Sequence, residues 1–207
     1  MNYTWQLHTI VNHGLGERIA RETREAGARG GTILVGRGSA HQTILQLLAL
    51  SDVEKDVLIT LVTDEQYEAV LHAIRNSKTL NKKNRGILYA IPLCGGKQMS
   101  EESNYELITI ITNRGYADDI MAAARKAGAR GGTILHARGT GTEGDATFFG
   151  ITVVPEKEQV LILADGKTAS NIKKAIASLP CLNKPGVGIM YATPVASFEQ
   201  LGNGQGE

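Results

Sequence analysis

The feature that most constrains the fold of this 207-residue chain is an internal duplication. Residues 27–34, which read Gly-Ala-Arg-Gly-Gly-Thr-Ile-Leu, recur unchanged as residues 128–135, 101 positions later. Further identities lie on both sides, at a spacing of 101 before this segment and of 102 from residue 54 onward. A repeat of about 100 residues has the length of a single domain, so each copy can bury its own core. We therefore expect a tandem duplication of one domain. The change of spacing places one extra residue in the loop between positions 39 and 54.

The hydrophobic pattern predicts the same six elements in each copy, in the order strand, helix, strand, strand, helix, strand. In the first copy we expect strands at 7–11, 32–35, 56–62 and 86–91, and helices at 16–26 and 65–74. In the second we expect strands at 106–112, 132–137, 159–164 and 188–193, a helix at 116–126 that Gly128 ends with a positive φ angle, and a helix capped by Asp165 or Thr168. Strand 58–62 is apolar on both alternations, which predicts burial on both faces.

The βαββαβ order predicts an α+β fold class, with two tandem ferredoxin-like domains that have antiparallel sheets. We expect domain 1 at 1–94, a linker at 95–104, domain 2 at 105–201 and a disordered tail at 202–207.

Composition and charge exclude several classes of function. The 22 basic and 21 acidic side chains nearly balance, so we expect no nucleic-acid partner. Cys94 and Cys181 lack the spacing of zinc ligands, and no apolar run approaches the ~20 residues of a membrane span. The start of the chain lacks the layout of a signal peptide, and we expect a cytoplasmic protein. Neither a Ser/His/Asp nor a Cys/His grouping is present, and we expect no paired carboxylates at recurring positions, so catalysis is not supported.

The segment after the second strand of the second copy, His-Ala-Arg-Gly-Thr-Gly-Thr-Glu-Gly-Asp at 136–145, has the ingredients of an anion site. Glycines let backbone N–H groups approach an anion, an arginine supplies a forked positive charge, and threonines supply hydroxyls. Neither phosphate-binding fingerprint, Gly-x-Gly-x-x-Gly or Gly-x-x-x-x-Gly-Lys-Ser/Thr, is present, so a flexible loop without a ligand stays an equal alternative. The candidate effector-binding residues here are Arg138, Gly139, Thr140, Gly141 and Thr142.

The first copy keeps Arg37, Gly38 and a hydroxyl at Ser39, and we include these three residues as candidates. It then diverges, because residues 42–50 have helical spacing of leucine and isoleucine. This segment is interpreted as a short amphipathic helix that covers its own domain, with a docking surface for a partner as the alternative.

A second candidate segment precedes the last strand of each copy. Lys82 and Lys184 occupy equivalent positions there, and Gly186 and Gly188 follow in the second copy. A solvated turn lysine is the commoner interpretation of such a position, and a lysine that meets a phosphate as a point charge is the alternative.

The segment Gly-Ala-Arg-Gly-Gly-Thr-Ile-Leu-His-Ala-Arg-Gly-Thr-Gly at 128–141, followed by a loop and the strand at 159–164, resembles the PII signalling protein family. The resemblance covers both copies. It implies a trimer that binds ATP or ADP as effector in clefts between subunits, with no further cofactor, and loops that dock on a membrane transporter or an enzyme. Arg138 stands where the family has a lysine, and Gly139 and Gly141 match the glycines at the base of the effector loop.

The second copy departs from the family at the Gly-Asp-Gly-Lys turn. Gly186 and Gly188 match its glycines, but Val187 replaces the aspartate and Ile189 replaces the phosphate-binding lysine. In the first copy only Gly86 survives. The effector loop contains no tyrosine, so no acceptor for nucleotidylation is present. A sensor that regulates a protein partner is thus our first hypothesis, and an oligomer that binds a metal or a small anion in place of a nucleotide is the alternative.

Overall fold

The computed structural model describes residues 3–39, 53–80, 86–93, 104–138, 156–182 and 186–202, together with the backbone of 147–148 and 151–152. The chain forms two compact units. Unit 1 comprises Met1–Gly36, Val53–Tyr105 and Pro194–Glu207, and unit 2 comprises Arg37–Asp52 and Glu106–Thr193. Nearly all of the expected linker, residues 95–103, and most of the expected tail lie outside the described residues.

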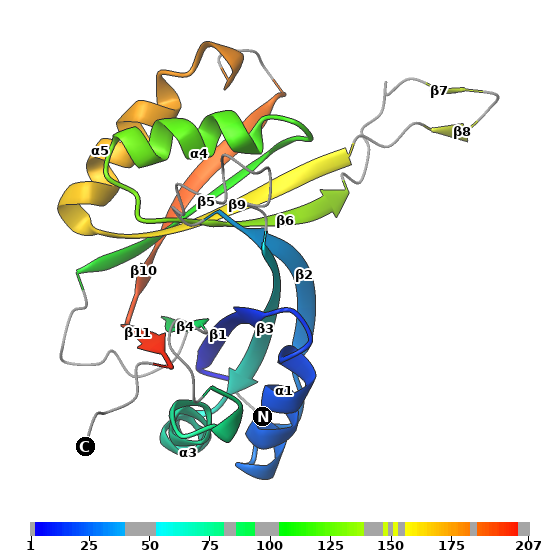
Figure 1. Cartoon of the computed structure of the whole chain (residues 1–207), viewed down its shortest axis with the longest axis vertical. Coiled ribbons are helices and arrows are strands. Elements are labelled where there is room, and N and C mark those ends of the chain that lie inside the picture. The colour runs from blue at the N-terminus through cyan, green and yellow to red at the C-terminus, as the bar shows by residue number, and fades with distance from the viewer. Residues whose placement is uncertain are drawn as a thin grey trace. The chain divides into compact units, whose positions relative to one another are not determined.

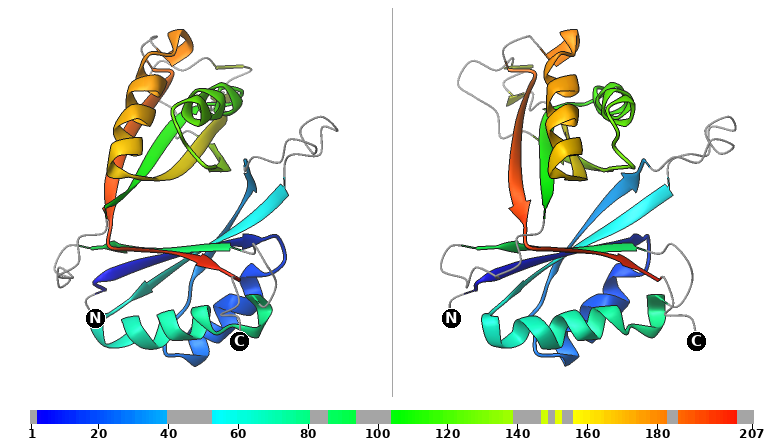
Figure 2. Two further views of the ribbon diagram at one scale, coloured as in Figure 1. Left: turned by 60° about the vertical axis from the view of Figure 1, so that its left-hand side comes forward. Right: turned by 90° about the vertical axis from the view of Figure 1, so that its left-hand side faces the viewer.

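Unit 1 is an antiparallel sheet with two helices on one face, as Figures 1 and 2 show. Its elements are β1 (Trp5–Asn12), α1 (Gly16–Glu25), β2 (Thr32–Gly38), β3 (Val53–Val62), α3 (Asp64–Arg75), a 3-10 turn (Lys78–Leu80), β4 (Gly86–Pro92) and β11 (Ser197–Leu201). The strand order β2-β3-β1-β4 is that of a ferredoxin-like sheet, with β11 added beside β4. The last residues of β2, from Arg37, group with unit 2.

The core of unit 1 lies between the sheet and its helices. Alternate residues of the strands, such as Leu7, Leu58 and Leu88, pack against Ile19 of α1 and Ile74 of α3. On the other alternation of β3 the burial is incomplete, because Leu61 remains 38% exposed. The expectation that this strand is buried on both faces is therefore wrong at its end.

The strand β11 is an element that the βαββαβ pattern did not predict. It pairs antiparallel with β4, from Ser197 opposite Ala90 to Leu201 opposite Gly86. The side chain of Leu201 joins the unit 1 core, and Glu199 receives a forked ion pair from Arg75 of α3, with Nε 2.8 Å from Oε2. The C-terminal end of the second copy thus belongs to unit 1, which departs from the domain boundary expected at 201.

Unit 2 repeats the same architecture. Its elements are β5 (Tyr105–Asn113), α4 (Ala117–Lys126), β6 (Thr133–Arg138), the short hairpin of β7 (Thr147–Phe148) and β8 (Ile151–Thr152), β9 (Glu156–Asp165), α5 (Gly166–Ala177), a 3-10 turn (Pro180–Leu182) and β10 (Gly188–Val195). Its strand order is β10-β5-β9-β6, and α4 and α5 cover one face (Figure 2). The predicted fold class, α+β with two tandem ferredoxin-like domains, is confirmed.

Local signals account for the ends of the helices. The Asp165 side chain accepts a hydrogen bond of 3.0 Å from the Thr168 backbone, which is an N-cap of α5 as expected. Gly27 and Gly128 have φ angles of 104° and 106° and follow α1 and α4. Only glycine adopts this conformation without strain, which explains why the repeated segment begins with glycine.

Candidate functional site

Four strand ends of unit 2 lie side by side and bring the two candidate segments to one end of the sheet. Arg138 at the end of β6 is opposite Glu156 at the start of β9. The backbone N–H of Arg114 donates to the Glu156 carbonyl at 3.1 Å, and that of Asn113 donates to the Val187 carbonyl at 3.0 Å. The base of the second loop, at Arg138, and the glycine turn before β10, at residues 186–188, are therefore separated by three strand spacings, about 14 Å. A ligand that contacts both must be elongated.

The Arg138 side chain is exposed at this end of the sheet. Among the described residues its guanidinium has no hydrogen bond or ion pair. Glu156, which faces it in register, is paired with Arg114, and the hydrogen bond from Arg114 lowers the pKa of the Glu156 carboxyl. Within the described part of the chain, no carboxylate therefore pairs with the guanidinium of Arg138.

The equivalent arginine of the first copy, Arg37, has a different environment within unit 2. Its Nη1 lies 3.0 Å from Oδ1 of Asp118 in the first turn of α4, and its Nη2 lies 4.0 Å from Oε1 of Glu158. The Arg37 side chain is only 18% exposed. Of the two loop-base arginines, this one is already bound to carboxylates.

Ser39 is likewise engaged by the protein. Its backbone N–H donates to the Gly132 carbonyl at 2.9 Å, and its hydroxyl donates to the same carbonyl at 3.2 Å. The guanidinium of Arg125 donates to the Ser39 carbonyl at 3.0 Å. Arg37 and Ser39 therefore have a structural role, and their predicted effector role remains untested.

The turn Gly186-Val187-Gly188 requires its glycines for the backbone. Gly186 has a φ angle of 79°, and a Cβ on Gly188 would lie 2.9 Å from the carbonyl oxygen of Ile111 in β5. Gly86 in unit 1 is equally tight against β1, with 2.5 Å to the Ile10 oxygen. These glycines are explained without a ligand. Ile189, which replaces the expected lysine, is 62% exposed.

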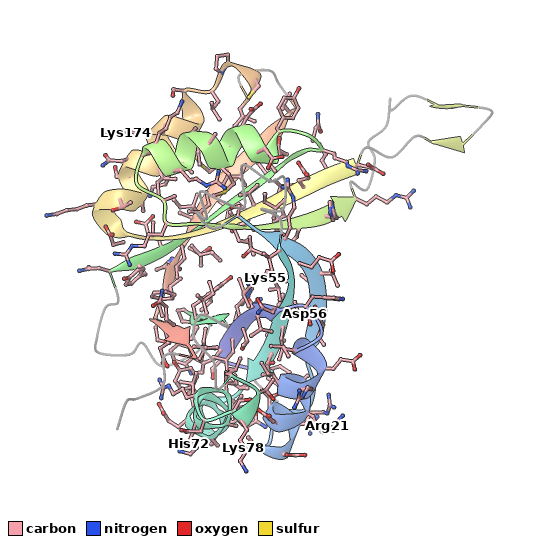
Figure 3. The ribbon with its side chains drawn as sticks, viewed as in Figure 1. Arg21, Lys55, Asp56, His72, Lys78 and Lys174 are labelled. Atoms are coloured by element: carbon pink, nitrogen blue, oxygen red, sulfur yellow. The ribbon has the colours of Figure 1, made fainter. Side chains whose placement is uncertain are left out.

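Each unit also has a buried carboxylate at the start of its first helix, which sequence reasoning missed. In unit 1 this carboxylate is Asp56 of β3, whose side chain is labelled in Figure 3. Its Oδ2 accepts hydrogen bonds of 2.9 Å from the backbone N–H groups of both Gly14 and Gly16. In unit 2 Oε2 of Glu158 accepts from Gly115 at 2.9 Å and from Ala117 at 3.2 Å. These bonds satisfy N–H groups that the helix itself leaves unpaired.

The sequence expectation that no paired carboxylates recur was therefore wrong. Glu54 and Asp56 of β3 recur as Glu156 and Glu158 of β9. A search for identical residues overlooks this recurrence, because the second carboxylate is an aspartate in one copy and a glutamate in the other. Both accept hydrogen bonds from backbone N–H groups at the start of the first helix. The burial of Asp56, 4% exposed, and of Glu158, also 4%, indicates a role in the scaffold.

A second duplicated pair lies beside these carboxylates. Lys55 donates to Oδ1 of Asn12 at 2.6 Å, and Lys157 donates to Oδ1 of Asn113 at 2.5 Å. Burial lowers the pKa of Lys55. The first pair links β1 to β3, and the second links β5 to β9. Each pair therefore holds two neighbouring strands together at the end of the sheet where the loop begins.

The two units differ at the residue next to the buried carboxylate. In unit 1 it is His13, whose Nδ1 lies 2.7 Å from Oδ1 of Asp56, and in unit 2 it is Arg114. The hydrogen bond to Asp56 raises the pKa of His13. At this equivalent position unit 1 therefore has a histidine and unit 2 has an arginine.

Six of the predicted site residues lie outside the described residues: Lys82, Gly139, Thr140, Gly141, Thr142 and Lys184. The described part of the chain contains no cluster of three or more His, Cys, Asp or Glu side chains arranged for a metal ion. None of the described helices has the length and apolar character that a membrane crossing needs.

Residues 105–204 match the model of the family described as Nitrogen regulatory protein P-II. The sequence matches none of the curated proteins compared with it. Among solved structures, a PII-like signaling protein of Thermus thermophilus is 20% identical, with 46% of this chain and 88% of that chain covered and a TM-score of 0.34. A chlorite dismutase mutant of Candidatus Nitrospira defluvii is 10% identical over 95% of this chain and 93% of that chain, with a TM-score of 0.25. At these TM-scores the structural likenesses carry no argument on function.

Proposed function

The second repeat of this chain belongs to the nitrogen regulatory protein P-II family, and from that premise we propose that the protein is a signalling regulator whose second repeat senses an anionic effector. Effector binding at the base of the second loop biases the loop, and the loop regulates a partner transporter or enzyme. A ligand shifts such an equilibrium only by its differential affinity for the two states.

The observation that carries this proposal is the difference between the two loop-base arginines. Arg37 is bound to Asp118, whereas Arg138 is exposed and has no partner among the described residues. An unpaired forked guanidinium beside a glycine-rich segment favours bidentate contact with a phosphate. The asymmetry supports a responsive second repeat and a first repeat whose loop base is already held.

An adenine nucleotide is the proposed effector because a ligand that contacts both Arg138 and the turn at Gly188 must be an elongated anion. Its phosphates would meet Arg138, and its remaining length would extend across β9 and β5 toward the turn at Gly188. Ile189 suits an apolar part of the ligand better than a phosphate, so we expect the phosphates at the Arg138 end.

Isothermal titration calorimetry with ATP and with ADP tests the proposal. We expect Arg138→Ala to weaken nucleotide binding by about 10- to 100-fold, the value of a charge-assisted hydrogen bond. Arg130→Ala is the matched control, because Arg130 is also an exposed arginine of unit 2. Equal affinity in Arg138→Ala and the control would exclude Arg138 from the site.

The same titrations address the alternative of a non-nucleotide ligand. No heat with ATP or ADP, together with binding of bicarbonate or a divalent metal, would favour an oligomer that binds a small anion or a metal. Arg138→Ala would then distinguish an anion from a metal as the ligand. The substitution should weaken binding of an anion, whereas a metal ion does not bind to a guanidinium and its affinity should not change.

A further inference from the structure

The strand β11 is bound at the edge of the unit 1 sheet in the way that many proteins bind an extended peptide. It pairs antiparallel with β4, from Ser197 opposite Ala90 to Leu201 opposite Gly86. The pairing begins directly after β10, because the backbone N–H of Ala196 donates to the Ala90 carbonyl at 2.9 Å. In such strand addition the main chain supplies affinity, and contacts to alternate side chains supply specificity.

Unit 1 contacts every second side chain of β11, on the side of the sheet that carries the helices. The Ser197 hydroxyl lies 3.3 Å from the Tyr67 hydroxyl. The guanidinium of Arg75 donates to both oxygens of the Glu199 carboxylate, with Nε at 3.0 and 2.8 Å. Leu201 is 4% exposed and belongs to the unit 1 core. The edge therefore binds a hydroxyl, a carboxylate and a leucine at alternate positions of the strand.

These contacts are not part of the duplicated fold. At a spacing of 102 the equivalents of Tyr67 and Arg75 are Ala169 and Ala177 of α5, which supply neither a hydroxyl nor a charge. In unit 2 no described strand is added beside β10, the strand that corresponds to β4. The βαββαβ unit therefore forms without a fifth strand, and α3 alone has side chains that bind one.

The contacts that hold β11 are of a kind that opens locally. The strand has only five residues, and its ion pair is at the surface, with the side chains of Arg75 and Glu199 41% and 29% exposed. Exposed ion pairs contribute little to stability, and short edge segments open at a small fraction of the cost of global unfolding. Covalent attachment to β10 gives β11 a high effective concentration at the edge. A competing segment must therefore overcome this advantage with its own contacts.

We propose that the β4 edge of unit 1 is a docking groove for an extended segment of a protein partner, and that β11 occupies this groove as an intramolecular competitor. The partner segment has the chemistry that the groove already binds, an acidic residue for Arg75 and an apolar residue two positions later in the place of Leu201. The acidic residue fixes the register, because a shift by one residue turns every side chain to the other face. Unit 1 thereby has a partner site of its own, apart from the loop of the second repeat.

Fluorescence anisotropy of a labelled peptide with the sequence of residues 194–203, titrated with the full chain, is the first test. In the native chain β11 competes with the peptide, so the apparent affinity falls with the fraction of open groove. Glu199→Arg places two like charges together and opens the groove, and we expect it to bind the peptide about 10-fold more tightly than the native chain. Glu25→Arg, the same charge reversal at an exposed glutamate of α1, is the matched control and should bind like the native chain.

Charge reversal of the peptide tests whether Arg75 selects the occupant. A second peptide carries the change Glu199→Arg. The Glu199→Arg chain, which keeps Arg75, should prefer the acidic peptide over this basic one by about 10-fold. An Arg75→Glu chain also repels its own β11 and should have the opposite preference.

Three outcomes would overturn the docking groove: peptide binding to neither the native chain nor Glu199→Arg, equal binding to both, or a peptide preference that does not follow the charge at position 75. Circular dichroism and the emission of Trp5 in the unit 1 core verify that the variants keep their fold. The assay contains no nucleotide, so this proposal and the proposed effector site fail or stand separately.

Discussion

Acidification should destabilise unit 1 through His8. This side chain of β1 is 7% exposed, and its ring stacks on Tyr89 at 4.8 Å between centroids. Nδ1 lies 3.1 Å from the Tyr89 hydroxyl, and Nε2 is buried without a partner among the described residues. Burial disfavours the charged imidazole and lowers the pKa of His8 to about 4.

The magnitude follows from proton linkage. The unfolded chain protonates this histidine near pH 6.5, so below that value the unfolded state binds more protons than the folded state. The stability contributed by neutral His8 is therefore complete above about pH 6.5 and is lost progressively as the pH falls toward 4. For these two pKa values the loss is about 2 kcal/mol by pH 5 and approaches about 3 kcal/mol near pH 4.

The assay uses Trp5, the single tryptophan of the chain. Trp5 is 2% exposed in the unit 1 core and lies 4.7 Å from the Tyr67 ring, so its fluorescence reports the unfolding of unit 1. Urea unfolding is measured at pH 7.5 and pH 5 for the native chain and for His8→Thr, which introduces the residue found at the equivalent position, Thr109.

Other groups titrate in both proteins, so the difference between them isolates His8. Between the two pH values the native chain should lose about 2 kcal/mol more than His8→Thr. A difference below about 0.5 kcal/mol, or an NMR titration of the His8 ring with a pKa near 6.5, would refute the reasoning.

Three further substitutions test the scaffold by urea unfolding. Asp56→Ala should cost about 3 kcal/mol, because two backbone N–H groups lose their acceptor, and a loss below about 1 kcal/mol would contradict that role. Arg75→Ala should cost about 0.5–1 kcal/mol, and a double-mutant cycle with Glu199→Ala should return a coupling of similar size; no coupling would mean that the pair does not hold β11. Gly86→Ala should cost about 2 kcal/mol or more because its Cβ would collide with a β1 carbonyl, whereas Gly30→Ala, with open space, should be nearly neutral.

The elements of the fold were predictable because the duplication doubles every signal. Each strand and helix of the βαββαβ pattern is seen twice, and the periodicity of one copy resolves what the other leaves open. β11 was not predictable in this way. Ser197 pairs with Ala90, 107 positions earlier, and no local pattern reports which sheet a strand at the end of a chain will join.

The candidate site was predictable only in part. The sequence identifies Arg37 and Arg138 as equivalent, but the bond of Arg37 to Asp118 depends on tertiary structure. The glycines at 186 and 188 suggested a ligand, although tight backbone packing explains them. A signal for Asp56 and Glu158 was present in the sequence, since a carboxylate recurs at a spacing of 102.

Two histidines make the stability of unit 1 depend on pH in opposite directions. The lowered pKa of His8 removes stability as the pH falls below about 6.5. The pKa of His13 is raised by Asp56, so its contribution is complete below about pH 6.5 and is lost as the pH rises through its folded pKa. Unit 2 has Thr109 and Arg114 at these positions, and neither changes charge near neutral pH. Through these two positions, unit 1 alone is therefore most stable within a limited pH range near neutrality.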